Sequence, residues 1–351
     1  MRLVIVGATG NVGTSLLRAV EDDPQIESVL GIARRRPELV VPKTEWAEAD
    51  IRDDALVAHF RGADCVVHLA WSIQPSRDLT TLWRTNVDGS TRVFRAVAEA
   101  GVKNLVYASS IGTYSPAPKD RAVDESWPTG GVRTSFYSRH KAEVERRLDR
   151  FEREQPDVRT VRLRPALIFK RESAAEQRRL FAGPFLPGSL VRPSLIPLVP
   201  DIPDLRFQAV HSYDVGEAYR LAATSDVRGA FNIAAEPVID PDVLAELFGA
   251  RKIRVPAGVV RRLADLTWRL RLQPTPSGWV DMALSVPIMD PTRAREELGW
   301  KPERSATDAL RDLIQGLNEG AGIETPPLAP KAGGRARERE LAQGVGARDD
   351  A

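Results

Sequence analysis

Cysteine is nearly missing from this chain of 351 residues, in which Cys65 is the only one. An internal disulfide is therefore excluded, and the scarcity fits the reducing cytoplasm. Long apolar runs are missing too. The N-terminal stretch MRLVIVGATG reaches its glycines too soon for a secretory signal, and no other segment approaches the length of a membrane span. We therefore expect a cytoplasmic protein.

The sequence also lacks a surplus of one charge. Lysine and arginine number 50 against 48 aspartate and glutamate residues, which leaves a net charge of +2. This balance gives no overall field that would select nucleic acid or an anionic membrane, so neither is expected as a partner. No spacing of His, Cys, Asp or Glu is typical of a metal site, and no metal is expected. The length suits one large domain or two unequal ones.

Short β-branched runs alternate with longer segments of helical period from Arg2 to about Leu163. The runs read RLVIV, SVLGIA, TEWAEA, DCVVHLA, NLVYASS and RTVRLR. Such alternation is typical of an α/β fold in which helices wrap a parallel sheet. A later run, RFQAVHS, a helix from Val215 to Ala223 and the run GAFNIA are expected to return to that sheet.

A proline-rich passage interrupts this alternation after Ile168. The segment GPFLPGSLVRPSLIPLVPDIP cannot form a long helix and is predicted to be an irregular cap over a cleft. A smaller helical region is expected from about Glu236 to Leu317. Residues 324–351 are rich in Pro, Gly, Ala and charge without an apolar period, so this tail is predicted to be disordered.

Three glycines follow the first predicted strand in LVIVGATGNVG. Gly7, Gly10 and Gly13 lie between that strand and the apolar helix TSLLRAV. In this order, glycines permit a tight turn, a close approach of the backbone to a pyrophosphate, and close packing of helix on strand. The start of the helix adds N–H groups and partial positive charge for phosphates. The loop predicts a dinucleotide site on a Rossmann-type doubly wound parallel sheet, the alternative being a glycine-rich turn without a ligand.

Tyr137 and Lys141 stand four residues apart in SFYSRHKAEVERRLDRFE, a predicted helix that Thr134 or Ser135 could cap. Positions three or four apart share one face of a helix, so both side chains are expected on its apolar, inward stripe. The stripe continues through Val144, Leu148 and Phe151, whereas Glu143, Glu145, Arg146 and Arg150 are expected to point elsewhere.

With the spacing GxxGxxG and the pair Tyr137 and Lys141, the chain resembles the extended short-chain dehydrogenases/reductases, or NAD-dependent epimerase/dehydratase family. Over about residues 1–318 it shares further marks of that family, namely Ser110, Asn86, Arg164 with Pro165, His211, Asp214 and the string DPTRAREELGWKP. The resemblance implies that Ser110, Tyr137 and Lys141 are catalytic. The tyrosine would exchange a proton with the substrate, the serine would hydrogen-bond the reacting oxygen, and the lysine would bind the nicotinamide ribose. Ser109, His211 and Asp214 are expected to be structural.

A phenol has an ordinary pKa of about 10, so acting as a base near neutral pH requires roughly 4 kcal/mol of stabilisation of its anion. In this family an adjacent ammonium and an oxidised nicotinamide supply it together. We therefore expect Lys141 and the oxidised nicotinamide together to lower the pKa of Tyr137.

The resemblance also indicates which dinucleotide is bound. Members that use NAD tend to carry Asp where Ala33 stands, and Arg34, Arg35 and Arg36 follow here. A guanidinium pairs with a 2′-phosphate that a carboxylate would repel, so NADP is favoured over NAD. A solvated arginine loop is the alternative. The implied cofactor-binding residues are Gly7, Thr9, Gly10, Asn11, Val12, Gly13, Arg34, Arg35, Asp50, Ile51, Leu69, Ala70, Asn86, Tyr137, Lys141 and Pro165. Trp71 replaces a small residue and either narrows the cleft or fills core.

The resemblance leaves the reaction open. Dehydratases of the family carry an Asp-Glu pair after the serine, where this chain has Ile111 and Gly112, so dehydration is not expected. Phe207 stands where nucleotide-sugar epimerases carry a basic residue. We expect an NAD(P)-dependent enzyme that transfers hydride at a secondary alcohol or ketone carbon, of the sugar epimerase or carbonyl reductase type. A non-catalytic redox sensor is the alternative.

These expectations divide the chain into two functional parts. Residues 1–170 and 207–235 are predicted to form the dinucleotide-binding domain, and residues 171–206 and 236–320 a smaller, mostly helical substrate region. The substrate would be a small alcohol, ketone or sugar. Relatives commonly dimerise by pairing the tyrosine helix with the helix after Asn86, and a homodimer could form here in the same way.

Overall fold

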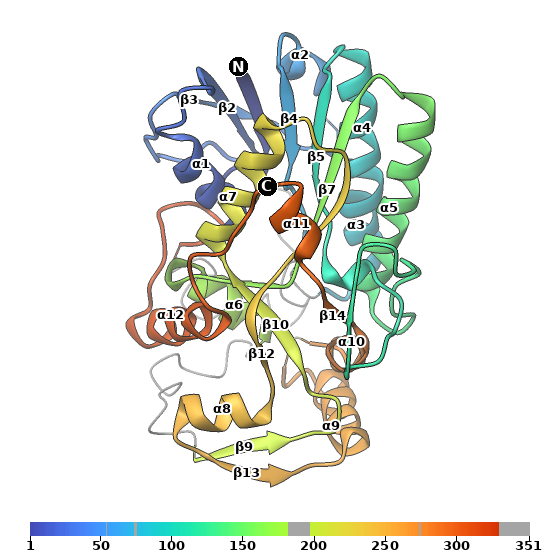
Figure 1. Cartoon of the computed structure of the whole chain (residues 1–351), viewed down its shortest axis with the longest axis vertical. Coiled ribbons are helices and arrows are strands. Elements are labelled where there is room, and N and C mark those ends of the chain that lie inside the picture. The colour runs from blue at the N-terminus through green and yellow to red at the C-terminus, as the bar shows by residue number, and fades with distance from the viewer. Residues whose placement is uncertain (54, 74–75, 182–196, 274, 330–351) are drawn as a thin grey trace.

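A seven-stranded parallel sheet forms the centre of the protein (Figure 1). A computed structural model describes residues 1–53, 55–73, 76–181, 197–273 and 275–329. The strands in spatial order are β11 (Gly229–Ile233), β7 (Arg159–Pro165), β5 (Asn104–Ala108), β4 (Cys65–His68), β1 (Arg2–Val6), β2 (Ser28–Ala33) and β3 (Thr44–Glu48). The order reverses between β1 and β4, which confirms the doubly wound α/β prediction.

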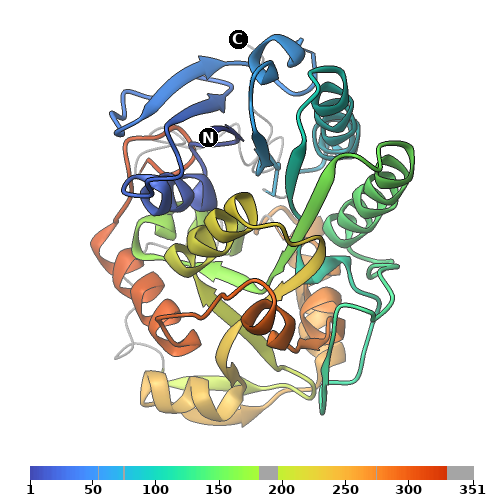
Figure 2. The ribbon, with the colours of Figure 1, turned by 45° about the horizontal axis from the view of Figure 1, so that its top comes forward.

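Helices cover both faces of this sheet (Figures 1 and 2). One face of the central sheet packs against α1 (Asn11–Val20) and α7 (Ser212–Thr224), whereas α12 (Ala306–Glu319) packs on the smaller sheet that contains Phe207–His211. The other packs against α2 (Val57–Phe60), α4 (Gly89–Glu99) and α5 (Phe136–Glu154), while α3 (Leu79–Trp83) precedes α4 through a π-helical turn at Arg84–Asp88. The middle strands are buried on both sides, which explains their continuous apolar runs.

The remaining elements lie beyond the carboxyl ends of the central strands (Figure 1). The described residues form three small sheets here. In one, β10 (Phe207–His211) lies between β8 (Leu167–Phe169) and β12 (Ala235–Ile239); the others pair β9 (Leu198–Asp201) with β13 (Arg251–Arg254) and β6 (Ala122–Val123) with β14 (Ile288–Met289). The helices here are α6 (Ala174–Phe181), α8 (Pro241–Phe248), α9 (Ala257–Arg269) and α10 (Gly278–Ser285), and short 3₁₀ turns lie at Ile111–Thr113 and Arg171–Ser173. The exception is α11 (Thr292–Glu296), which packs beside β11, where Arg293 donates to the carbonyl of Arg228.

The run RFQAVHS is a strand, but our prediction that it returns to the central sheet is wrong. It forms β10, which pairs with β8 and β12, whereas GAFNIA supplies β11 at the edge of the central sheet. The side chain of Gln208 bonds the backbone N and O of Met289 at 2.7 and 3.0 Å, which holds β10 against β14. These partners are distant in sequence, so the strand's own residues did not reveal its sheet.

The predicted disordered tail differs from the structure at its beginning. Thr325 is buried and donates its hydroxyl to the Thr9 carbonyl at 2.9 Å, and Leu328 is fully buried. The Arg179 guanidinium donates to the carbonyl of Pro327. Residues 324–329 are thus packed against the glycine loop, because a few side chains suited to burial outweigh the polar composition. Residues 330–351 lie outside the described residues, as does the part of the predicted proline-rich cap up to residue 196.

No helix in the described residues combines the length and the apolar character needed to cross a membrane.

Candidate active site

Between β1 and α1, the glycine loop has no side chains at the positions where the backbone packs closely or faces a ligand. Gly7 has φ +91°, and a Cβ there would lie 2.6 Å from the Ala70 nitrogen. A Cβ on Gly13 would lie 2.5 Å from the Ala8 carbonyl oxygen. Gly10 precedes α1 and supplies no side-chain cap, so the first N–H groups of the helix are left for a ligand. This arrangement fits the pyrophosphate of a dinucleotide.

Tyr137 is held at the start of α5, opposite the loop that follows β5. Ser135 caps the helix by accepting a hydrogen bond from the Ser138 nitrogen at 3.3 Å. The Tyr137 ring packs on Gly112, where a Cβ would lie 2.8 Å from the ring. Burial raises the pKa of Tyr137 to about 12, and a hydrogen bond with Ser110 opposes this rise. At neutral pH the phenol therefore keeps its proton, and Lys141 is not among the groups that shift its pKa.

Lys141 lies one turn further along α5 and is almost completely buried. Its ammonium donates to the Ala108 carbonyl at 2.6 Å and lies 3.5 Å from the centre of the Trp71 ring, but 6.0 Å from the centre of the Tyr137 ring. Burial lowers the pKa of Lys141, while the charge of Glu145 raises it. The cation is thus held by the strand end and by Trp71, which explains why it does not lower the pKa of the phenol.

Two adjoining cavities share the glycine loop. We call the one beside Tyr137 the inner cavity and the one beside Arg34 the outer cavity. Predicted site residues that line the inner cavity are Gly7, Gly10, Asn11, Val12, Gly13, Leu69, Ser110, Tyr137, Lys141 and Pro165. Those that line the outer cavity are Gly7, Thr9, Gly10, Arg34, Asp50, Ile51, Leu69 and Ala70. Trp71 lines both cavities and also packs against the core on either side of the sheet.

Two predicted cofactor residues lie apart from these walls. Arg35 is exposed, next to Arg34. Asn86 is fully buried, and its amide binds the backbone of Ser72, accepting from the nitrogen at 2.7 Å and donating to the oxygen at 3.0 Å. Asn86 therefore positions the loop that carries Trp71.

The end of the inner cavity beside Tyr137 is apolar, which the sequence did not reveal. Trp279 and Met282 of α10 line it together with Ile111, Leu180 and Ile73. The Trp279 ring lies 5.2 Å from the Tyr137 ring, tilted by 31°. The only hint in the sequence is that Trp279 and Met282 stand three residues apart and so share a helix face. Ordinary core residues show the same spacing, so it does not identify a cavity wall.

The side chain of Glu145 lies on the opposite side of its helix from the one that the sequence predicted. We expected it to point away from the core, but it is 1% exposed. It accepts hydrogen bonds from Arg164 at 2.6 and 2.9 Å and from the Ser109 hydroxyl. The reason is Arg164, which ends the fully buried strand β7 and requires a counter-charge. Arg146 and Arg150 are exposed, as expected.

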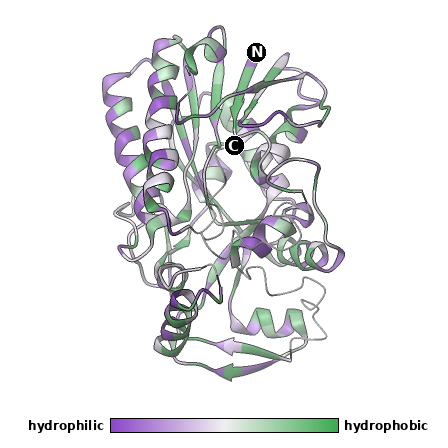
Figure 3. Cartoon of the chain, turned by 180° about the vertical axis from the view of Figure 1, so that it is seen from behind, coloured by the Kyte–Doolittle hydropathy of each residue, from purple (hydrophilic) through white to green (hydrophobic). Residues whose placement is uncertain are grey.

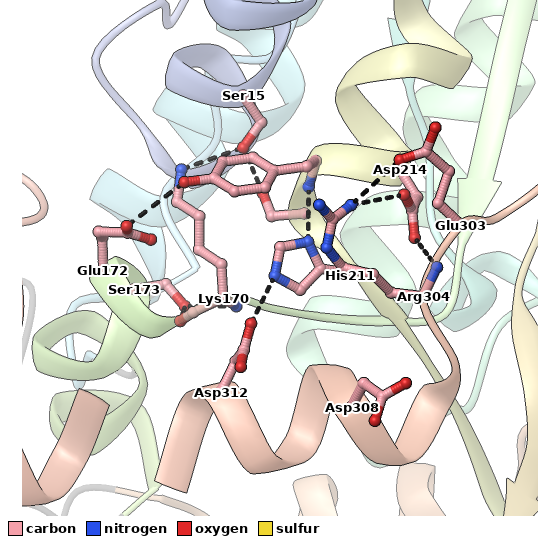
Figure 4. A network of polar contacts seen from close by, with 12 residues as sticks. Ser15, Lys170, Glu172, Ser173, His211, Asp214, Glu303, Arg304, Asp308 and Asp312 are labelled. Carbon is pink, nitrogen blue, oxygen red and sulfur yellow. Dashed lines mark hydrogen bonds and ion pairs between the residues drawn. The ribbon is translucent and has the colours of Figure 1, made fainter. Parts of the chain in front are cut away.

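A network of polar contacts links α1 to the residue that follows β8 (Figure 4). Lys170, buried at the end of β8, donates to the Asn11 carbonyl at 2.9 Å and to the hydroxyls of Thr14 and Ser15 at 2.7 and 3.0 Å. His211 accepts from the Tyr213 nitrogen and bonds Asp312 of α12, both at 3.2 Å. Here His211 has a structural role.

Asp214 joins two other parts of the chain. Its side chain pairs with Arg304 at 3.2 Å, and its carbonyl accepts a hydrogen bond from Trp300 at 2.7 Å. Asp214 thus also has a structural role. In the described part of the chain, no group of three His, Cys, Asp or Glu side chains could hold a metal ion.

Comparison with known proteins gives a family and a fold. The sequence model of the NAD dependent epimerase/dehydratase family matches residues 3–234. An uncharacterized protein of Mycobacterium tuberculosis is 27% identical over 326 residues, which cover 92% of this chain but 31% of that protein. This chain therefore spans about a third of that relative's length. L-arabinose 1-dehydrogenase (NAD(P)(+)) of Haloferax volcanii is 32% identical over 110 residues, 31% of this chain and 41% of that protein.

Among solved structures, UDP-glucose-4-epimerase from Stenotrophomonas maltophila, with bound NAD and formylated UDP-arabinopyranose, has a TM-score of 0.68. The alignment covers 91% of this chain and 98% of that one at 20% identity. At this identity the likeness shows a shared fold.

Proposed function

Because this chain belongs to the NAD dependent epimerase/dehydratase family, we propose that it is an NAD(P)-dependent carbonyl reductase that acts on an apolar ketone. The observation that carries the proposal is that Ser110, Tyr137 and Lys141 line one cavity with the glycine loop. The proposal assigns residues 1–170 and 207–235 to the dinucleotide and residues 171–206 and 236–320 to the substrate, supported by Trp279 and Met282 in the cavity wall.

The proposed roles follow from the protonation of each group. A bound reduced nicotinamide supplies the hydride. Tyr137, which burial keeps protonated, donates its proton to the carbonyl oxygen, so the product is a secondary alcohol. Ser110 accepts from the Gly112 nitrogen at 3.0 Å and hydrogen-bonds Tyr137, which orients the phenol. Lys141 donates one N–H to the Ala108 carbonyl, and its remaining N–H groups would donate to ribose hydroxyls.

The lining of the inner cavity favours an uncharged substrate. Among the described residues that line it, the charged side chains are Lys141 and Glu176. The phosphates of a nucleotide diphosphate need cations or a cluster of N–H donors. Beside Tyr137 the cavity wall instead consists of Trp279 and Met282, whose side chains carry no charge. An apolar ketone would instead bury its surface against Trp279 and Met282.

The test is turnover by the wild-type protein on a panel of ketones, aldehydes, alcohols and nucleotide sugars. We expect stoichiometric consumption of reduced cofactor with apolar ketones and free exchange of the cofactor on dialysis. Interconversion of sugars by a protein that retains its cofactor would contradict the reductase and favour an epimerase. Cofactor binding without turnover anywhere on the panel would favour a redox sensor.

We further propose that NADP is the preferred dinucleotide. Arg34 lines the outer cavity together with Asp50. Arg52 pairs with Asp50 at 2.9 Å and so offsets the negative charge that would repel a 2′-phosphate.

The change Arg34→Ala is expected to raise the Kd of NADPH about tenfold to hundredfold, because a charge-assisted hydrogen bond contributes about 1.5–3 kcal/mol. The Kd of NADH should change little. Fluorescence titration with both cofactors measures this, and Arg36→Ala, on an exposed neighbour, is the control. Equal losses for NADH and NADPH would rule out a contact with the 2′-phosphate.

A further inference from the structure

Helix α9 lies at the end of the molecule remote from the central sheet (Figures 1 and 3). It presents an apolar stripe to solvent. Val259, Leu263, Leu266 and Leu270 are 44, 55, 52 and 59% exposed. Their spacing of four, three and four residues places them on one face of the helix. We call these four residues the α9 stripe.

More exposed apolar side chains lie nearby in the chain. Leu272 follows the helix and is 55% exposed, and Ile253, 48% exposed, lies on β13, four residues before α9 begins. Single exposed apolar residues are common, but a row of them along one helix marks an interaction surface.

Basic residues flank the stripe in the sequence. Residues 251–272 contain seven arginine and lysine residues and one acidic residue, Asp265. The basic residues are Arg251, Lys252, Arg254, Arg261, Arg262, Arg269 and Arg271. Some are paired, since Arg269 binds Asp265 at 2.9 Å and Lys252 binds Asp242. The segment is nevertheless strongly cationic, which the net charge of +2 for the whole chain conceals.

We propose that the α9 stripe and its basic flanks dock this protein on the surface of an anionic lipid bilayer. A helix with an apolar face between cationic side chains buries that face at the level of the headgroups, and its arginines meet anionic lipids. Charge complementarity selects the lipid surface over a second copy of this chain, because a second copy would bring an equally cationic face. No membrane-crossing helix is needed for this mode of binding.

The docking surface adjoins the wall of the inner cavity. Arg261 of α9 binds Asp281 of α10 at 2.8 Å, and the neighbouring residues of α10, Trp279 and Met282, line the cavity. A protein docked through α9 would therefore hold its apolar cavity close to the lipid. The docking itself does not depend on the proposed reductase activity.

The test is flotation of the full chain with phosphatidylcholine vesicles that either contain or lack phosphatidylglycerol. We expect binding to the anionic vesicles only, and release by high salt, because salt screens the basic flanks. The double change Leu263→Asn and Leu266→Asn should lower the partition coefficient about tenfold or more, since it removes apolar surface from the interface. Arg262→Gln should lower it about fivefold, the contribution of one cation near an anionic surface.

Matched controls lie outside the docking surface. Val40→Asn combined with Leu79→Asn changes two exposed apolar residues elsewhere, and Arg92→Gln removes an exposed cation from α4. These should float like wild type. Absence of flotation, or equal binding to both kinds of vesicle, would overturn the proposal. So would a lowered melting temperature or a changed mass in light scattering for the double leucine variant, because either shows that protein already covers the stripe.

Discussion

Replacing Tyr137 with phenylalanine is expected to lower kcat for ketone reduction by between about a hundredfold and ten thousandfold, the usual contribution of a positioned general acid. In the proposed reaction the phenol is the proton donor, whereas the ring packs against Gly112 and Trp279 through contacts that phenylalanine keeps. The Kd of the reduced cofactor should therefore stay within about twofold, since the change removes a group needed only in the transition state. Steady-state rates and fluorescence titration measure the two quantities.

Tyr107→Phe is the matched control for this prediction. Tyr107 is a second buried tyrosine, on the central strand β5, and its hydroxyl has no hydrogen-bond partner among the described residues. Removing that hydroxyl breaks no hydrogen bond, so the free energy of unfolding and kcat should both stay close to those of the wild type. If Tyr137→Phe kept its turnover, or lost cofactor affinity together with turnover, the assigned role of the phenol would be wrong.

The pH dependence of the reaction checks the same role. Burial raises the pKa of Tyr137 to about 12. In the direction of reduction the protonated phenol is the active form, so the rate should not fall across the neutral range from titration of this group. A rate that fell with rising pH near neutrality and lost that dependence in Tyr137→Phe would show instead a phenol with a strongly lowered pKa.

The glycine loop and the pair Tyr137 and Lys141 line one cavity, and the sequence patterns that place them there are local. The glycines need only the strand before them and the helix after them, and Tyr137 and Lys141 share a face because a helix places positions four apart together. Both patterns are complete within a short stretch of chain. The structure adds the reason for Gly112, which makes room for the tyrosine ring.

The features that the sequence did not reveal depend on contacts between distant segments. Trp279 reaches the cavity only because α10 packs against the start of α5, where a Cβ on Gly278 would lie 2.2 Å from the Thr134 carbonyl oxygen. Lys170 is satisfied by α1, more than 150 residues earlier in the chain. Such neighbours leave no periodic trace in either segment, and so burial of a charged residue is the hardest feature to predict.

Replacing Glu145 with alanine is expected to lower the free energy of unfolding by about 3–5 kcal/mol, the cost of removing one partner from a buried ion pair. Arg164 and Glu145 are 5 and 2% exposed in their side chains and lie 2.6 Å apart. Without the carboxylate, the guanidinium keeps bonds to the Tyr114 hydroxyl at 3.0 Å and the Glu125 carbonyl at 2.9 Å but loses its counter-charge. Urea denaturation of wild type and variant measures the difference.

The effect should depend on pH in a defined direction. Burial raises the pKa of Glu145, but the hydrogen bond and charge of Arg164 and the charge of Arg162 outweigh it, so the pKa lies below its ordinary value of 4.5. The carboxylate therefore stabilises the fold above about pH 4.5, and this stabilisation is lost as the pH falls further and the folded protein takes up the proton. Glu143→Ala is the control, because Glu143 lies on the same helix but forms more exposed pairs with Arg146 and Arg147. It should cost less than about 1 kcal/mol. Equal losses for the two variants would show that the Glu145 pair adds no more stability than a surface pair.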